Sequence, residues 1–351
     1  MGHDASDKLI KSLCKLTFLP IFGTLCAKEQ STKDITMIRR VIPFAVLLGI
    51  ASCSGAAVNG PAGGSGTETG TDDGTTETST IPDTLAVNLK SVSFDGTNLQ
   101  VTIDSLDSTP VSVTYLRDSR LDLSGYTAFR MQEDALDRLF VALGAVSTDG
   151  SVQAVTVGDG GQFNTYFAGG AYDRSGTFDR PTGDGTAGSG QVSYAGSYVA
   201  VTNMGAPRDG GADDVALPIT AGTDTSLTPR QPVRVQGDIF LNANFSDNSI
   251  NGAIYNRQLV DTNYALVDVI LVPGTINDDG TFEGVAEYDT RAPIGTYGGI
   301  FGGTDAHSVA GLVHLTEFDT TIDNEQEHGV FVLTQCGPDN TLPVCTNVAS
   351  P

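Results

Sequence analysis

A short pattern of strand, tight turn and strand recurs along this chain and constrains its fold more than any other feature. Three Asp-Gly pairs lie between segments that alternate apolar and polar side chains: Asp95-Gly96, Asp149-Gly150 and Asp279-Gly280. Glycine readily adopts the positive φ of a tight turn, so each pair predicts a β-hairpin. A fourth turn is predicted at Asp247-Asn248. Closely spaced turns without sustained helical periodicity indicate an all-β sandwich or barrel.

The second half of the chain contains enough strands to close a barrel. Eight strands are predicted there, at 191–202, 232–245, 249–259, 264–273, 281–289, 296–302, 308–317 and 328–334. Closing eight antiparallel strands removes exposed sheet edges, and the segment 179–190, DRPTGDGTAGSG, looks like a break before them. We therefore expect an all-β fold: an N-terminal β-rich handle-like domain (84–185), an eight-stranded antiparallel β-barrel (186–336) and a C-terminal tail (337–351).

One segment has helical spacing. Residues 131–140, MQEDALDRLF, place four large apolar side chains at helix-like intervals, with acidic residues early. A short helix and the lead-in to a strand are both compatible with this pattern.

Residues 37–53, MIRRVIPFAVLLGIASC, have the pattern of a secretory signal. Two arginines precede an apolar run over 41–50, which ends in small residues before Cys53. The run is shorter than the roughly 20 residues that a membrane-spanning helix needs. Its last four residues, IASC, resemble the lipobox of bacterial lipoproteins, in which the chain is cut before the cysteine and the cysteine is acylated. We therefore expect a signal peptide at 37–52 and a lipid on Cys53.

The segments on either side of this signal are not expected to belong to the folded body of the mature protein. Residues 54–82 are almost entirely Gly, Ser, Thr, Ala, Asp and Glu, a composition that cannot bury enough surface to become ordered. With Cys53, residues 53–83 would form a tether with a reach of roughly 30 Å. Residues 1–36 are interpreted as a mis-annotated extension before a true start at Met37, with an unusually long n-region as the alternative.

Charge and cysteine content limit the possible partners and bonds. Past Cys53 the chain has 38 acidic and 12 basic residues, a net charge of −26, so nucleic acid is not an expected partner. Cys336 and Cys345 are the two remaining cysteines of an exported chain, and Gly337, Pro338 and Pro343 let the segment between them turn back. We predict a disulfide that pins the C-terminal tail. A zinc site is not expected, because no histidine lies nearby.

Five segments of the second half carry a family resemblance: 191–203 (QVSYAGSYVAVTN), 236–257 (QGDIFLNANFSDNSINGAIYNR), 281–286 (TFEGVA), 295–314 (GTYGGIFGGTDAHSVAGLVH) and 328–333 (HGVFVL). These glycine- and aromatic-rich strands resemble the barrel of transferrin-binding protein B-like surface lipoproteins. In that family a lipidated cysteine and a flexible anchor precede a β-rich handle and an eight-stranded barrel. The resemblance covers about 190–335, together with the lipobox and the anchor. It implies a surface lipoprotein that binds a solute or a partner. The well-known transferrin receptors have two lobes, whereas this chain has room for one and lacks an evident counterpart of their long loops.

No set of residues in the sequence predicts catalysis. The three histidines past Cys53 are His307, His314 and His328, and we expect the last two to lie side by side on neighbouring strands, at the surface or lining the barrel. No G-x-S-x-G motif is present, and the acidic turns at 277–280 and 319–324 lack calcium-loop spacing. We therefore predict no catalytic residue, no metal and no cofactor.

These observations predict a non-enzymatic lipoprotein, anchored by lipid in the bacterial outer membrane on its periplasmic or cell-surface face. It would bind a solute or a partner protein, with nutrient acquisition as a role. The alternative is a small β-barrel carrier or enzyme that holds a ligand or metal in or at the barrel. Ten large side chains are expected to fill the barrel, so that binding uses its rim loops or the handle: Phe240, Phe245, Tyr255, Leu266, Ile270, Phe282, Ile300, Phe301, Leu312 and Leu315.

Overall fold

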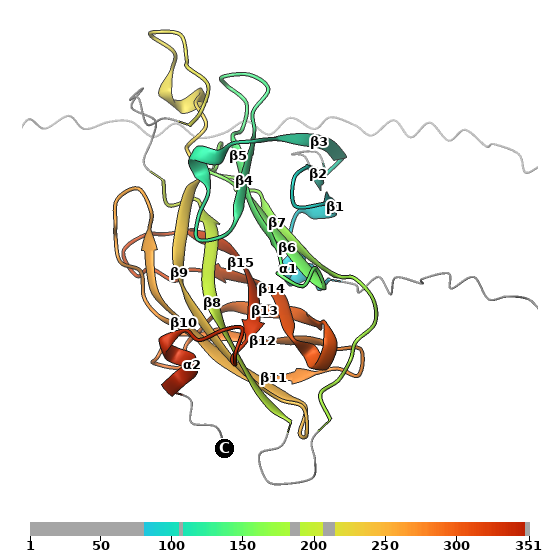
Figure 1. The fold of residues 1–351 in the computed structure, drawn as a ribbon. Coiled ribbons are helices and arrows are strands. Elements are labelled where there is room, and N and C mark those ends of the chain that lie inside the picture. Colours follow the sequence, from blue (N-terminus) through green and yellow to red (C-terminus); the bar gives the residue numbers. More distant parts are fainter. Residues whose placement is uncertain (1–80, 105–107, 183–189, 206–214, 348–351) are drawn as a thin grey trace, which may run out of the picture. The chain divides into compact units, whose positions relative to one another are not determined.

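The computed structural model describes residues 81–104, 108–182, 190–205 and 215–347, and nearly all of their regular structure is β (Figure 1). The expected features of residues 1–80 lie outside the described residues. They are the extension, the signal peptide, the lipidated Cys53 and most of the tether.

The first seven strands form one antiparallel sheet in chain order, β1 to β7, preceded by a single helical turn. Their bounds are α1 Asp83–Ala86, β1 Leu89–Phe94, β2 Leu99–Asp104, β3 Pro110–Arg117, η1 Ser119–Leu121, β4 Thr127–Met131, β5 Phe140–Val146, β6 Val152–Asp159 and β7 Ala168–Arg174.

The last eight strands form a closed antiparallel barrel in the order β10-β11-β12-β13-β14-β15-β8-β9. Their bounds are β8 Gln191–Thr202, η2 Thr225–Leu227, β9 Val233–Asn244, β10 Ser249–Leu259, β11 Val269–Ile276, β12 Thr281–Glu287, β13 Pro293–Gly302, η3 Thr304–Ala306, β14 Ser308–Thr316, β15 Gln326–Gln335 and α2 Pro343–Asn347. This architecture confirms the predicted fold class. The described residues belong to one compact unit, and the division into domains at 84–185 and 186–336 stays a prediction.

The turn chemistry works as the sequence suggests. Gly96, Gly150 and Gly280 have φ values of 85°, 71° and 79° and lie between consecutive antiparallel strands. In each turn the preceding aspartate accepts a backbone N–H two residues further on, at 2.8 to 3.1 Å. The turn at Asp247-Asn248 is built in the same way. These Asx-type bonds fix the reversals that set the strand register.

Two local predictions need correction. The described segment 131–140 contains no helix: the Asp134 carboxylate and carbonyl accept the backbone N–H groups of Leu136 and Asp137, a local turn that competes with a helix. The lead-in to a strand was therefore the right alternative. The strand predicted at 264–273 begins only at Val269, because Leu266 N donates to Arg257 O and holds 260–268 as a loop.

The barrel interior is filled by aromatic and aliphatic side chains. Phe301 contacts three other buried aromatic rings, with its ring centroid 5.5 Å from that of Tyr194, 5.0 Å from that of Phe245 and 5.1 Å from that of Phe282. Aliphatic side chains of all eight strands join this buried cluster. The expectation of a filled interior is therefore met by the described residues.

Half of the ten residues assigned to the interior lie elsewhere. Phe245, Leu266, Phe282, Phe301 and Leu315 belong to the interior cluster. Ile300 and Leu312 point outward into a second cluster between barrel and sheet, and Phe240, Tyr255 and Ile270 belong to neither cluster. Side chains alternate along a strand, so a strand covered on both faces is apolar at successive positions and its inward face cannot be identified from hydrophobicity alone.

The seven-stranded sheet packs on the outer face of β8, β13, β14 and β15. Side-chain hydrogen bonds, among them those of Thr156 and Tyr126, fix it there. Thr156 Oγ1 lies 2.9 Å from both the Nδ1 and the carbonyl oxygen of His328. The Tyr126 hydroxyl donates to Ser197 O at 3.0 Å and accepts from Val332 N at 2.8 Å. Sheet and barrel therefore share one buried interface.

Candidate partner-binding surface

The histidines do not assemble a reactive centre. His314 and His328 are paired across β14 and β15, as expected, and both contact α1: His314 Nδ1 lies 3.1 Å from Thr84 O and His328 Nε2 lies 2.7 Å from Leu85 O. The expectation that they lie at the surface or line the barrel is wrong for His328, which is fully buried on the outer face of the barrel, where β6 and α1 cover it. Among the residues that the structure describes, no group of three or more His, Cys, Asp or Glu side chains could hold a metal ion. The two rings instead support the start of the folded body.

A buried polar cluster closes one end of the barrel. Arg257 on β10 donates through Nη2 to Glu327 on β15 at 2.7 Å, and both side chains are fully buried. Tyr198 on β8 donates to the other carboxylate oxygen of Glu327 at 2.7 Å. Burial, and then the charge of Glu327, raises the pKa of the Tyr198 hydroxyl well above its ordinary value, so this donor stays protonated. The carboxylate is thus held between two donors from two other strands.

The same cluster positions the loops at this end of the barrel. Arg257 Nη1 donates to Val267 O at 2.6 Å in the loop 260–268, and its guanidinium lies 5.3 Å above the Phe318 ring in the loop 317–325. These loops expose Tyr264, Val267 and Ile322, by 48%, 45% and 37%. We call these three side chains the rim surface.

A second group of exposed apolar side chains lies on loops tied to the seven-stranded sheet. Leu136, Phe163 and Leu227 are 40%, 59% and 47% exposed. The amide of Gln162 connects their loops, because its Nε2 donates to the carbonyls of Leu136 and Leu227, both at 2.9 Å. We call these three side chains the apex cluster. Exposed apolar groups that converge from separate loops are typical of protein-binding sites.

The loop that carries Phe163 is held rigidly. The partly buried Arg138 forms an ion pair with buried Asp159 and donates to the carbonyls of Thr165 and Gln162 at 2.8 and 2.7 Å. Asp159 in turn accepts the backbone N–H groups of Gly161 and Phe167. The loop therefore does not depend on its exposed residues for order.

The tip of this loop is conformationally strained. Gln162 and Thr165 exchange two backbone hydrogen bonds around Phe163 and Asn164, whose φ values are 54° and 56°. Such a turn favours Gly or Asn at both central positions, and a bulky residue with positive φ is an outlier. An exposed aromatic ring held in a strained turn suggests a functional role for Phe163.

Acidic residues surround the rim surface. The exposed carboxylates of the loops 260–268 and 317–325 belong to Asp261, Asp268, Glu317 and Asp323, and Asp319 is half-buried. Asp261 is paired with Arg234 at 2.9 Å. Together with the high negative charge of the chain, these groups favour a partner surface that is positively charged.

The sequence reasoning missed most of this surface. None of the six exposed side chains was singled out as a binding residue: Leu136, Phe163, Leu227, Tyr264, Val267 and Ile322. A detectable signal was the lone aromatic in GGQFNT, because its Gln and Asn neighbours are turn residues rather than strand residues.

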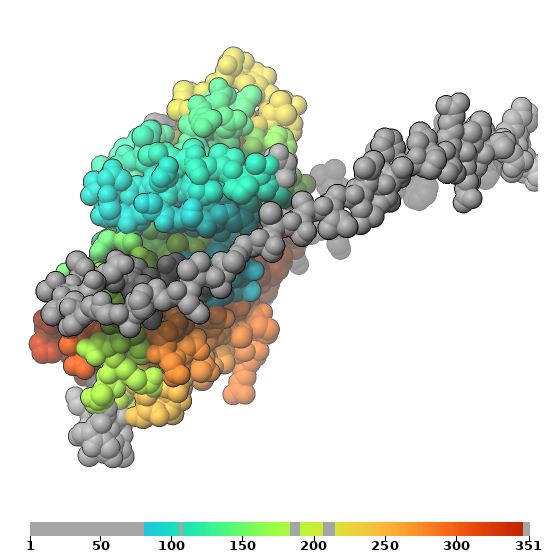
Figure 2. All heavy atoms as spheres, turned by 90° about the vertical axis from the view of Figure 1, so that its right-hand side faces the viewer, coloured from blue at the N-terminus to red at the C-terminus, as the bar shows by residue number. Residues whose placement is uncertain are grey.

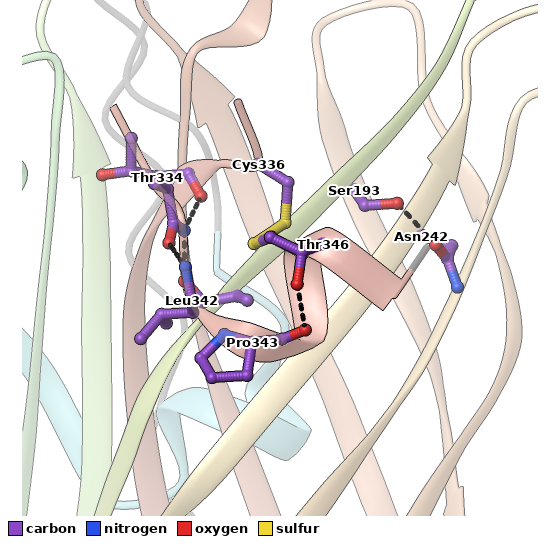
Figure 3. The surroundings of a disulfide bond; sticks show 10 residues. Ser193, Asn242, Thr334, Cys336, Leu342, Pro343 and Thr346 are labelled. Carbon is purple, nitrogen blue, oxygen red and sulfur yellow. Dashed lines mark hydrogen bonds between the residues drawn. A yellow bond between two sulfur atoms is a disulfide. The ribbon is translucent and has the colours of Figure 1, made fainter. Parts of the chain in front are cut away.

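Cys336 and Cys345 lie at disulfide distance, with their sulfur atoms 2.10 Å apart (Figure 3). The tail between them also bonds to the barrel: Cys336 N donates to Ser193 O at 2.8 Å, and Asn340 Nδ2 donates to Ala195 O and Thr334 O, both at 2.9 Å. The tail is therefore attached to β8 and β15 at several points. Within the described part of the chain, no helix is both long and apolar enough to cross a membrane.

Comparisons with known proteins find similarity only among solved structures. No protein-family model and no curated protein matches the chain. It is similar to intact Ap-TbpB with N and C lobes (11% identity, TM-score 0.33), and to a double mutant of the vaccine antigen transferrin-binding protein B from Haemophilus parasuis Hp5 (11%, 0.33). It is also similar to isotype 1 transferrin-binding protein B from serogroup B Neisseria meningitidis (12%, 0.31).

These alignments cover 68% of this chain and 52%, 51% and 49% of those chains. The chain therefore spans about half the length of these structures. The similarity concerns the fold, and it is distant.

Proposed function

We propose that this protein is a non-enzymatic lipoprotein of the bacterial outer membrane, anchored through an acylated Cys53, that binds a partner protein with its apex cluster and rim surface. The lipobox and the tether composition of 54–82 support the anchor. The filled barrel interior supports binding by loops rather than in a lumen. This filling also argues against the alternative of a carrier or enzyme with its ligand inside the barrel.

The observation that carries the proposal is Phe163. Its ring is exposed in a strained turn, and the ion pair between partly buried Arg138 and buried Asp159 holds that turn in place. Rigid, exposed aromatic residues bind protein partners at a low cost in conformational entropy. A partner that recruits a nutrient to the cell surface would fit this arrangement.

Site-specific photo-crosslinking in the native cell tests the binding surface. A photoreactive phenylalanine analogue at Phe163 or Tyr264 should give an adduct with one and the same partner. The matched control is the same analogue at Leu342, which is 44% exposed on the C-terminal tail. Equal adducts from all three positions, or none from Phe163 and Tyr264, would contradict the proposed surface.

The anchor is tested separately. Cys53→Ala should abolish incorporation of labelled palmitate and move the protein from the membrane fraction to the soluble fraction. Unchanged membrane retention would contradict the lipid anchor without affecting the binding surface.

A further inference from the structure

A cleft of about 520 Å³ opens between the first and last strands of the seven-stranded sheet. The two strands are tied at one end, where Asn88 N donates to Ala168 O at 3.0 Å and Asn88 Oδ1 accepts from Ala168 N at 3.1 Å. Beyond this contact β1 and β7 diverge, and no further hydrogen bond joins them in the described chain. Strands β1 to β3, coloured cyan to teal, form part of the upper half of the face shown in Figure 2.

Both walls of the cleft present unpaired strand backbone. Backbone groups alternate sides along a strand. The backbone N–H and C=O groups of Ala168 point toward β1, so those of Gly170 and Tyr172 point the same way. Ser175 is an odd number of residues away, and its N–H donates to Ser151 O on the opposite side, as this alternation requires. On β1, Asp95 N bonds to Asn98 O across the turn, so the backbone groups of Phe94 and Val92 point away from β2.

The strand directions specify what could fill the gap. All six pairings in the sheet are antiparallel, so β1 and β7 run in the same direction and cannot close on each other with antiparallel pairing. One inserted strand, antiparallel to both, would satisfy both edges and complete a closed sheet of eight strands. Addition of an extended peptide to exposed strand edges is an established recognition mode.

The cleft lining specifies the side chains of such a strand. Leu89, Phe94 and Val155 line the cleft and belong to the buried cluster inside the sheet, so one face of the strand would be apolar. The exposed carboxylates of Asp83 and Asp173 also line it, and neither forms an ion pair among the described residues. The one lysine of the lining, Lys90, is paired with Asp104 at 2.9 Å. The free charge at the cleft is therefore negative.

We propose that this cleft binds an extended segment of another protein in which apolar residues alternate with lysine or arginine. The nearest competitor is the tether of this chain, but residues 54–82 contain four acidic residues and no basic one. Its charge is the same as that of the cleft, so a basic segment supplied by a partner is favoured. This proposal does not depend on the apex cluster or the rim surface.

The test uses the soluble mature chain from Ser54 and an acetylated, amidated peptide of sequence KVKVKVK. Binding should protect the amides of Val92, Phe94, Gly170 and Tyr172 from hydrogen exchange. The same peptide with N-methylated valines keeps its charge but loses three of the seven N–H donors of its residues. It should bind about 10-fold or more weakly, the effect of losing one to two net hydrogen bonds.

Variants of the protein distinguish the contribution of the two carboxylates to peptide binding from that of the strand backbone. Asp83→Asn/Asp173→Asn should weaken binding, whereas Asp278→Asn/Asp305→Asn, an equal charge change on exposed turns, should not. Val92→Pro removes a backbone N–H that points into the cleft and forms no hydrogen bond within the sheet, so it should also weaken binding. An unchanged melting curve would verify that this variant is folded.

Three results would overturn the proposal. Equal affinity for the N-methylated peptide would show adsorption by charge alone. Protection of Gly170 and Tyr172 without peptide, lost when the chain begins at Ile81, would identify the tether as the occupant. Protection that rises with protein concentration would identify a second copy. In each case Phe163-dependent crosslinking would be unaffected, so the proposed function stands or falls separately.

Discussion

His328 makes the stability of this protein sensitive to acid. Its side chain is fully buried between β15, β6 and α1. Nε2 faces the Leu85 carbonyl at 2.7 Å, and because a carbonyl only accepts, Nε2 carries the proton. Nδ1 is then unprotonated and lies 2.9 Å from the Thr156 hydroxyl, whose single proton is shared between Nδ1 and the His328 carbonyl. Burial, and then the neighbouring His314 ring, lowers the pKa of His328 to about 3.

The direction and size of the effect follow from this pKa. An unfolded histidine titrates near 6.5, so between pH 6.5 and pH 3 the unfolded chain binds a proton that folded His328 does not. Keeping His328 neutral therefore costs no stability above pH 6.5, and the free energy of unfolding falls as the pH drops from 6.5 toward 3. At pH 5 the loss is about 2 kcal/mol, from 1.36 kcal/mol per pH unit over about 1.5 units. For a body of this size that lowers the melting temperature by about 4–8 °C.

Thermal melts of the wild-type soluble chain and of His328→Gln, each at pH 7.5 and pH 5, measure how much of the acid-induced loss of stability is due to His328. The variant should lose less stability on acidification than the wild type, by about 2 kcal/mol, even where its stability at pH 7.5 is lower. His307→Gln is the matched control, because His307 is partly exposed and far from α1. Equal acid-induced losses in His328→Gln and the wild type would refute a neutral, buried His328.

Three further predictions concern stability. Glu327→Gln leaves the buried Arg257 charge unpaired and should lower the free energy of unfolding, measured by urea denaturation, by about 3–5 kcal/mol. The double variant Arg257→Met/Glu327→Leu removes both charges and should recover most of the lost stability. A double variant as unstable as Glu327→Gln would show that the unpaired charge is not the cause. Val87 has φ 49° and ψ −103°, as at the first central position of a type II′ turn, so Val87→Gly should raise the melting temperature rather than lower it. Cys345→Ser should cost roughly 2–3 kcal/mol at most and leave the β content by circular dichroism unchanged, because the bridge would close a short loop; two reactive thiols in unreduced exported protein would show that the bridge does not form.

Much of the fold could be predicted because its signals are local. The Asp-Gly turns need only glycine at positive φ and an aspartate that accepts a nearby N–H, so hairpins could be placed from neighbouring residues alone. Most barrel strands were predicted within a few residues for the same reason. The expectations for residues 1–80 rest equally on local patterns, and they stay predictions.

Only the tertiary structure decided which apolar side chains face inward. Tyr198 and Val199 are adjacent and both fully buried, one in the barrel interior and the other against the seven-stranded sheet. Alternation identifies a buried face only when the other face meets water, and here the sheet covers it. For this reason Ile300 and Leu312 were assigned to the wrong side.

The candidate surface could not be predicted from the sequence for a related reason. Arg257 and Glu327 are 70 residues apart, and Arg138 and Asp159 are 21 apart, so each pair exists only because strand order and register bring its members together. The exposed positions of Phe163 and Val267 depend on those pairs. The cleft likewise depends on the count and direction of seven strands, since an unpaired edge is a property of the whole sheet and not of any one segment.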